Sequence, residues 1–70
     1  MILFNLAGAE FIELIKLLKF MHFAESGGHA KMMVDSGEVK LNGQVEFRRR
    51  AKLRLGDVIE IAGKKVSIEA

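Results

Sequence analysis

The residues best suited to chemistry are a run of cations in the second half of the chain. Arg48, Arg49 and Arg50 are consecutive, and Lys52 and Arg54 follow at alternate positions without an intervening acid. Clustered arginine and lysine neutralise phosphate groups, and arginine also stacks on exposed bases. A solvated charged rim is the simpler alternative. Four cations within five residues exceed what solubility requires, so we expect an anionic partner.

The positive charge of the whole chain is concentrated around this run. Residues 26–55 contain seven lysines and arginines against three acids, whereas residues 1–25 and 56–70 each have a net charge of −1. The overall charge of +2 therefore belongs to a polarised molecule. Such a surface attracts a polyanion.

A helix is predicted to begin just before the run. Ser26 is suited to the N-cap position, because its hydroxyl can accept a hydrogen bond from a backbone N–H two or three residues further on. We expect the helix to continue to about Ser36 and to end at Gly37, a typical stop residue. The residues expected on its buried face are Ala30, Met33 and Val34.

Two glycines in the first turn of this helix have two interpretations. Gly27 and Gly28 are unusual there, because glycine lowers helix stability relative to alanine. They could permit close packing against the first helix or the sheet. They could also leave backbone N–H groups open to a phosphate at the positive end of the helix. The two interpretations are compatible.

Asn42 and Gly43 form a strong hairpin signal between two apolar segments. A two-residue turn would place the apolar residues of the two strands on opposite faces. A three-residue loop over residues 42–44 would place them on one face, and a slip of one residue exchanges the faces. We favour burial and expect the longer loop or a bulge, so that Val39, Leu41, Val45 and Phe47 share one face. Lys40 would then lie across from Glu46 on the solvent face.

The remaining elements complete an α+β fold. Glu10–Met21 is predicted to be a helix, because apolar residues recur at helical spacing at Phe11, Leu14, Ile15 and Leu18. Ile2–Leu6 is either a short strand or an N-terminal arm, and we favour the strand. Val58–Ile61 and Lys65–Glu69 are predicted to be strands that bury Ile59, Ile61, Val66 and Ile68. We expect two helices packed on one side of a small, mostly antiparallel sheet.

The cationic run itself is predicted to be partly loop and partly strand. Three consecutive arginines cannot all point the same way on a strand, so part of the run must be a loop. Beyond it, Leu53 and Leu55 are expected to point inward while Lys52 and Arg54 point outward. A turn at Gly56-Asp57 closes the segment.

Composition argues against several other classes of protein. There is no cysteine, and neither His22 nor His29 has an acid at metal-ligand spacing. The segment 26–31 does not match a phosphate-binding P-loop. We therefore expect one domain over residues 1–70 that is not an enzyme and uses no cofactor or metal. Without an apolar run of about 18 residues or a basic signal-peptide start, we expect a cytoplasmic protein and no membrane contact.

Several spaced residues together carry a family resemblance. They span about half of the chain and are Ser26, Gly27, Gly28, Ala30, Lys31, Gly37, Val39, Asn42, Gly43, Glu46, Arg48, Arg49, Lys52, Leu53, Gly56 and Asp57. In order and spacing they resemble the RNA-binding domain first named in the fourth small-subunit ribosomal protein, the S-four-like domain with its alpha-L motif. The chain is most similar to its short stand-alone bacterial version, the YbcJ-like family.

The resemblance implies two helices on a small sheet, with RNA bound along the second helix and the basic loop beyond the hairpin. By position, residues 26–28 would be the signature of the helix start, and Lys31 its outward basic residue. Asn42-Gly43 would form the hairpin tip, and Gly56-Asp57 the closing turn.

Two positions depart from the family pattern. Gly27 occupies a position where many larger members have arginine, so one positive charge is lost. Ala51 occupies a position where the short members often have glycine. Alanine at this position stiffens the loop.

We therefore expect an RNA-binding module that recognises structured RNA, similar to ribosomal or transfer RNA, through a basic helix face and the arginine-rich loop. The expected RNA-binding residues are Ser26, Gly27, Gly28, His29, Lys31, Lys40, Asn42, Arg48, Arg49, Arg50 and Lys52. The alternative is a protein-interaction adaptor whose basic face docks an acidic partner. Charge alone does not distinguish RNA from DNA. We expect a monomer.

Overall fold

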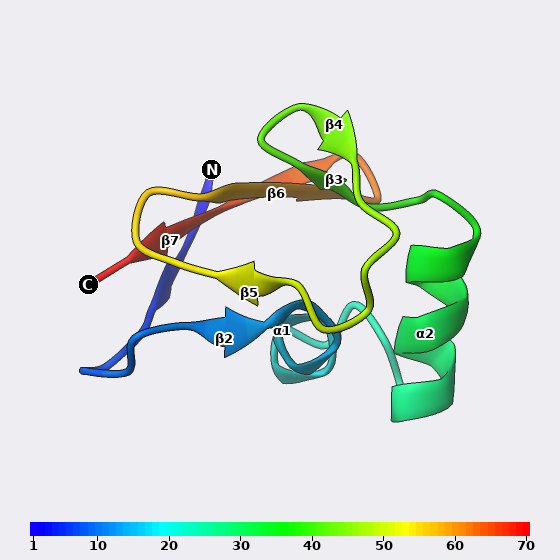
Figure 1. Cartoon of the computed structure of the whole chain (residues 1–70), viewed down its shortest axis with the longest axis horizontal. Coiled ribbons are helices and arrows are strands. Elements are labelled where there is room, and N and C mark those ends of the chain that lie inside the picture. The colour runs from blue at the N-terminus through cyan, green and yellow to red at the C-terminus, as the bar shows by residue number, and fades with distance from the viewer.

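The protein consists of a five-stranded sheet with two helices on one of its faces, and of a separate two-stranded sheet (Figure 1). The computed structural model describes residues 1–70. The elements in chain order are β1 (Ile2–Asn5), β2 (Ile12–Glu13), α1 (Leu14–Phe20), α2 (Gly27–Asp35), β3 (Lys40–Leu41), β4 (Gln44–Val45), β5 (Lys52–Leu53), β6 (Val58–Ile61) and β7 (Lys64–Glu69). The sheet has the order β1-β7-β6-β3-β4, and only the β1–β7 pair is parallel. The predicted α+β fold class is confirmed.

The hairpin of β6 and β7 supplies much of the inner face of the sheet. Alternating side chains of the two strands point to the helices, as expected for a half-buried antiparallel pair. The predicted set is confirmed, because Ile59, Ile61, Val66 and Ile68 are all buried. The two strands are joined at Ala62-Gly63, where both residues have positive φ, 53° and 74°. Such a turn matches the twist of the strands that it joins.

The first apolar segment is a strand, as predicted. β1 pairs in parallel with β7, with Ile2 opposite Val66 and Asn5 opposite Glu69. The pairing continues one step further, where the Leu6 amide donates to the Glu69 carbonyl at 2.9 Å. β1 therefore forms one edge of the sheet.

The first helix begins later than predicted. Instead of Glu10–Met21, the helix spans Leu14–Phe20, and Ile12–Glu13 forms the short strand β2. β2 pairs with β5, with Ile12 opposite Leu53. Pairing with a segment forty residues further on therefore overrides the helical periodicity. As a result, Phe11 lies outside the helix and not on its buried face.

The second helix confirms its prediction. The Ser26 hydroxyl accepts a hydrogen bond from the His29 amide at 3.1 Å, and the helix runs from Gly27 to Asp35. Ser36 is the C-cap and Gly37 follows with φ of 78°. The buried residues are the expected Ala30, Met33 and Val34.

The hairpin of β3 and β4 has a two-residue turn, so the predicted three-residue loop is wrong. Leu41 pairs with Gln44, and Asn42 and Gly43 both have positive φ, 51° and 88°. This conformation suits Asn-Gly, and here turn chemistry prevails over burial. Lys40 consequently lies opposite Val45, not Glu46 as predicted.

The apolar residues of the hairpin are accordingly divided between two faces. Val39 is buried, whereas Phe47 is 62% exposed. Val45 and Phe47 instead cover Gly37 from outside, where an added Cβ would lie 3.6 Å from each side chain. The four residues therefore do not share one face.

The segment after β5 corrects one further prediction. Leu53 is buried as expected, but Leu55 is 61% exposed. β5 ends at Leu53 and the chain turns at Gly56, where φ is 93°, so the alternation of faces stops before Leu55. The turn at Gly56-Asp57 is confirmed.

The core consists only of apolar residues. Fifteen side chains are buried and none of them is polar or charged. Neither helix has the length and apolar character needed to cross a membrane. The charged residues therefore all lie on the surface, where their arrangement determines what the protein can bind.

Candidate nucleic-acid interface

The three consecutive arginines lie in a loop, residues 46–51, which we call the arginine loop. It joins β4 to β5, and buried Ala51 anchors its end. Backbone bonds attach it to α1, because the Leu14 amide donates to the Ala51 carbonyl at 2.9 Å and the Ile15 amide to the Arg49 carbonyl at 3.1 Å. The loop is therefore held against the first helix.

Arg48 is paired with an acid of its own loop. Its Nε donates to Glu46 Oε2 at 3.1 Å and its Nη2 to Glu46 Oε1 at 2.9 Å. The Arg48 amide also donates to Glu46 Oε2 at 2.9 Å. These hydrogen bonds lower the pKa of Glu46, although burial opposes the shift. Much of the Arg48 charge is thus compensated within the loop.

Arg49 connects the loop to the second helix. It makes a two-pronged contact with Asp35, with Nε–Oδ1 and Nη2–Oδ2 distances of 3.0 and 2.6 Å. The hydrogen bonds from Arg49 lower the pKa of Asp35 below its usual value of 3.8. The contact fixes the position of the loop relative to α2, although exposed ion pairs contribute little stability.

The Arg49–Asp35 pair predicts a pH-dependent difference between the wild type and an Asp35→Asn variant. Because the pKa of Asp35 is lower in the folded state, the pair stabilises the fold above pH 3.8. That contribution disappears as the pH falls through the lowered value. We expect the variant to melt below the wild type at neutral pH and the difference to vanish in acid. A difference that does not shrink as the pH falls below 3.8 would contradict the ion-pair explanation.

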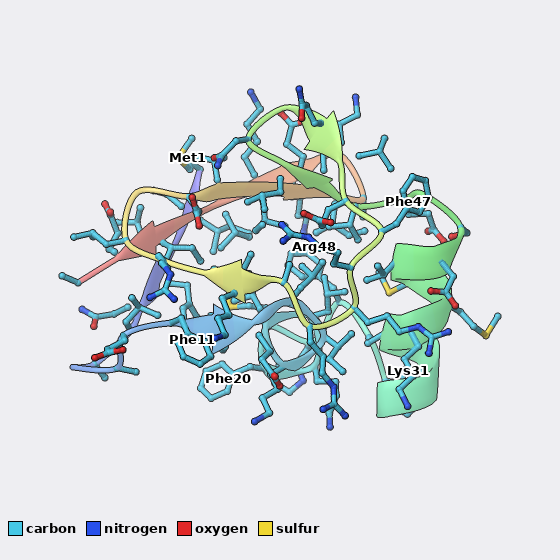
Figure 2. The ribbon with its side chains drawn as sticks, in the orientation of Figure 1. Met1, Phe11, Phe20, Lys31, Phe47 and Arg48 are labelled. Carbon is cyan, nitrogen blue, oxygen red and sulfur yellow. The ribbon has the colours of Figure 1, made fainter.

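Arg50 differs from its two neighbours, because its side chain has no ion pair. It lines a shallow hollow of about 530 Å³ that we call the basic groove. The lining residues are Arg48, Arg50, Ala51, Lys52 and Arg54. Every charged side chain lining the groove is a cation. One of them, Arg48, is labelled in Figure 2, where it lies between β5 and the hairpin of β3 and β4.

Arg54 was not among the predicted RNA-binding residues. The signal for it was present in the sequence, because Arg50, Lys52 and Arg54 alternate with buried Ala51 and Leu53. This alternation directs the three cations to one side. Lys52 and Arg54 also lie over the ring of Phe11, which the helical periodicity had assigned to the core.

The start of α2 is open. An added Cβ would lie 3.9 Å from Ser26 Oγ at Gly28 and 4.0 Å from Lys19 Nζ at Gly27, which is ordinary contact. The close-packing interpretation of the two glycines is therefore wrong. Lys19, from the last turn of α1, brings a further cation to this helix start and was not among the predicted RNA-binding residues.

Two further predicted residues flank the helix start. His29 is exposed, and its Nδ1 accepts a hydrogen bond from the Glu25 amide at 3.0 Å. Lys31 is exposed and unpaired. It lies four residues before Asp35 and so shares the helix face that Arg49 contacts. Lys31 and the arginine loop are thus on the same side of the molecule.

The structure does not bring Lys40 and Asn42 into this group. Lys40 is next to buried Val39 and lies on the sheet face away from the helices. The Asn42 side chain is used internally, because its Nδ2 donates to Asp57 Oδ1 at 3.1 Å and its Oδ1 accepts from the Val58 amide at 2.9 Å. Asn42 thereby ties the hairpin tip to the Gly56-Asp57 turn.

No three histidine or acidic side chains gather closely enough to hold a metal ion. The arrangement can instead compensate negative charge over an extended strip. Within the basic groove, Arg50, Lys52 and Arg54 have no acidic partner.

Comparison with known proteins identifies the family. The chain is 39% identical over 67 residues to YbcJ of Escherichia coli (strain K12), named as a candidate RNA-binding protein, and the match covers 96% of each chain. It is 43% identical over 54 residues to RlbA of Bacillus subtilis (strain 168), named as a probable ribosome maturation protein, covering 77% of this chain and 76% of RlbA.

The solution structure of E. coli YbcJ, described as revealing an alpha-L motif involved in RNA binding, has the same fold. Its TM-score is 0.75 at 38% identity, and the superposition covers 100% of this chain and 89% of that one. The S4 domain family matches residues 4–69. The predicted resemblance is therefore confirmed, and the chain belongs to the S4 domain family.

Proposed function

We propose that this protein binds structured RNA through the basic groove and the arginine loop, with the open start of α2 beside them. The basic groove carries the proposal, because Arg50, Lys52 and Arg54 point into it and have no acidic partner. Cations on a rigid surface compensate phosphates without first giving up an internal ion pair. The names of the related proteins support RNA as the polyanion.

Among structured RNAs, ribosomal RNA is the first candidate and transfer RNA the second. The relative RlbA is named as a probable ribosome maturation protein, which supports ribosomal RNA. The chain has no Trp or Tyr. Of its exposed rings, Phe20 packs edge-on against Phe4 and Phe47 covers Gly37, so they do not form a row of free rings on which several single-stranded bases could stack. Recognition by phosphate position and RNA shape remains. The proposal includes a monomer acting in the cytoplasm, where these RNAs are present.

The test is a titration of the purified, nuclease-treated protein with structured ribosomal RNA fragments at several salt concentrations. Each phosphate contact contributes about −0.7 to −0.9 to the slope of log affinity against log salt. We expect a slope of about −3 or steeper, and weaker binding to duplex DNA of the same length. A shallow slope would contradict the proposal. So would equal displacement by polyglutamate, which would indicate an acidic protein partner.

The open helix start gives a second, separate test with Gly28→Ala. Because space is available for the methyl group, alanine should raise the free energy of unfolding by up to about 1 kcal/mol. If a phosphate approaches the bare N–H groups, RNA affinity should fall in this more stable variant. Thermal melts and RNA titration together measure both effects. Unchanged affinity would remove the helix start from the RNA surface and leave the basic groove.

A further inference from the structure

A ribbon of two short strands presents an aromatic ring to two cations. β2 and β5 are antiparallel, with Glu13 opposite Lys52. One step further in the same register places Phe11 across from Arg54, so the three side chains share the outer face of the ribbon. Lys52 Nζ lies 4.9 Å and Arg54 Cζ 5.4 Å from the centre of the Phe11 ring. Both distances allow attraction of a cation by the ring face.

The backbone at Arg54 is also held in place. Its amide donates to Asp57 Oδ2 at 2.8 Å, and Asp57 Oδ1 accepts from Asn42 Nδ2 at 3.1 Å. The hairpin tip thus fixes the turn that presents Arg54. The side chain is held by the ring and the main chain by this clamp.

No acidic side chain forms an ion pair with either of the two cations. Glu13, directly opposite Lys52, instead lies 3.7 Å from Lys16 Nζ. Neither Lys52 nor Arg54 has an ion pair. Two like charges over one ring repel each other, and the ring face offsets part of that repulsion. The arrangement leaves a concentrated positive charge without a counter-charge from the protein.

We propose that Phe11, Lys52 and Arg54 form a subsite for a phosphate of the RNA backbone, in which Phe11 is a positioning residue. The subsite rests on the proposed function and extends the RNA surface from the arginine loop to Phe11, the residue before β2. Phe11 holds the two flexible side chains together before RNA arrives. Less conformational freedom is then lost on binding, which raises affinity.

The test is a double-mutant cycle on RNA affinity. We expect Phe11→Leu to weaken binding by about five-fold, since two ordered side chains become free. In a Lys52→Gln/Arg54→Gln background, the same change should have no effect, because Phe11 acts only through these cations. Phe11→Tyr should keep wild-type affinity. The matched control is Phe20→Leu, which alters a 68% exposed ring packed edge-on against Phe4, and it should leave affinity unchanged.

The outcomes separate this inference from the proposed function. Equal losses from Phe11→Leu in both backgrounds would overturn it, because the ring would then act on the fold or contact RNA directly. Unchanged affinity of Phe11→Leu, with a wild type that binds RNA, would also overturn it and leave the proposed function intact. A wild type that does not bind RNA would overturn both.

Discussion

Replacing Arg50, Lys52 and Arg54 together by glutamine is expected to remove most RNA binding while leaving the fold intact. The three side chains are solvent-exposed and form no ion pair. Losing three phosphate contacts should flatten the slope of log affinity against log salt by about two units. At about 0.15 M salt, losing these three contacts corresponds to a loss of RNA affinity on the order of 100-fold.

The measurement is RNA titration at several salt concentrations, after circular dichroism has shown a native fold. A control variant with the same change in net charge is Lys16→Gln, Lys64→Gln, Lys65→Gln. These lysines lie outside the basic groove, and two of them are already paired, with Glu13 and Glu60. If the control flattened the slope equally, net charge and not the groove would govern binding.

Leu14→Ala is expected to lower the free energy of unfolding by about 2–5 kcal/mol. Leu14 begins α1, is completely buried, and its amide bonds to the end of the arginine loop. Truncation would leave a cavity between the helix and the sheet. A domain of this size has a total stability of roughly 4–10 kcal/mol, so the variant could be largely unfolded.

Denaturant titration measures this change. Leu3→Ala is the matched control, because the same atoms are removed from a side chain that is 65% exposed. It should cost less than about 0.5 kcal/mol. Similar losses in the two variants would show that burial does not determine the effect.

The elements predicted correctly are those that local signals determine. Ser26 and Gly37 mark the ends of α2 through backbone chemistry that is complete within a few residues. The β6–β7 hairpin carries strict alternation on both sides of a tight turn. Neither prediction required knowledge of what the element would pack against, so neither was disturbed by the tertiary fold.

The errors arose where distant segments decide the conformation. Residues 12–13 have helical periodicity but pair with β5, which the sequence order does not reveal. In the β3–β4 hairpin, burial and turn chemistry conflicted. The prediction followed burial. In the structure, the exposed Phe47 instead packs over Gly37, an apolar contact outside the main core. A periodicity argument cannot detect such a contact.

The sequence predicted which cations lie close together, but not how their side chains are arranged and paired. Composition located the arginine run, yet it could not show that Asp35 and Glu46 engage two arginines and leave Arg50 unpaired. The charge count of residues 26–55 includes both acids, but it does not show which cations they pair with. The role of Asn42 was also hidden, because a hairpin tip can face solvent or, as here, clamp a neighbouring turn.

The parallel pairing of β1 with β7 has a consequence for the order in which the chain folds. It joins residues 2–5 to residues 66–69, and the Asn5–Ala70 hydrogen bond closes a separation of 65 positions. Contacts between such distant residues form late, because loop closure must precede them. During synthesis, β1 is made before β7 and must wait for it. The apolar segment 2–5 is therefore without its native partner until residues 66–69 have been made.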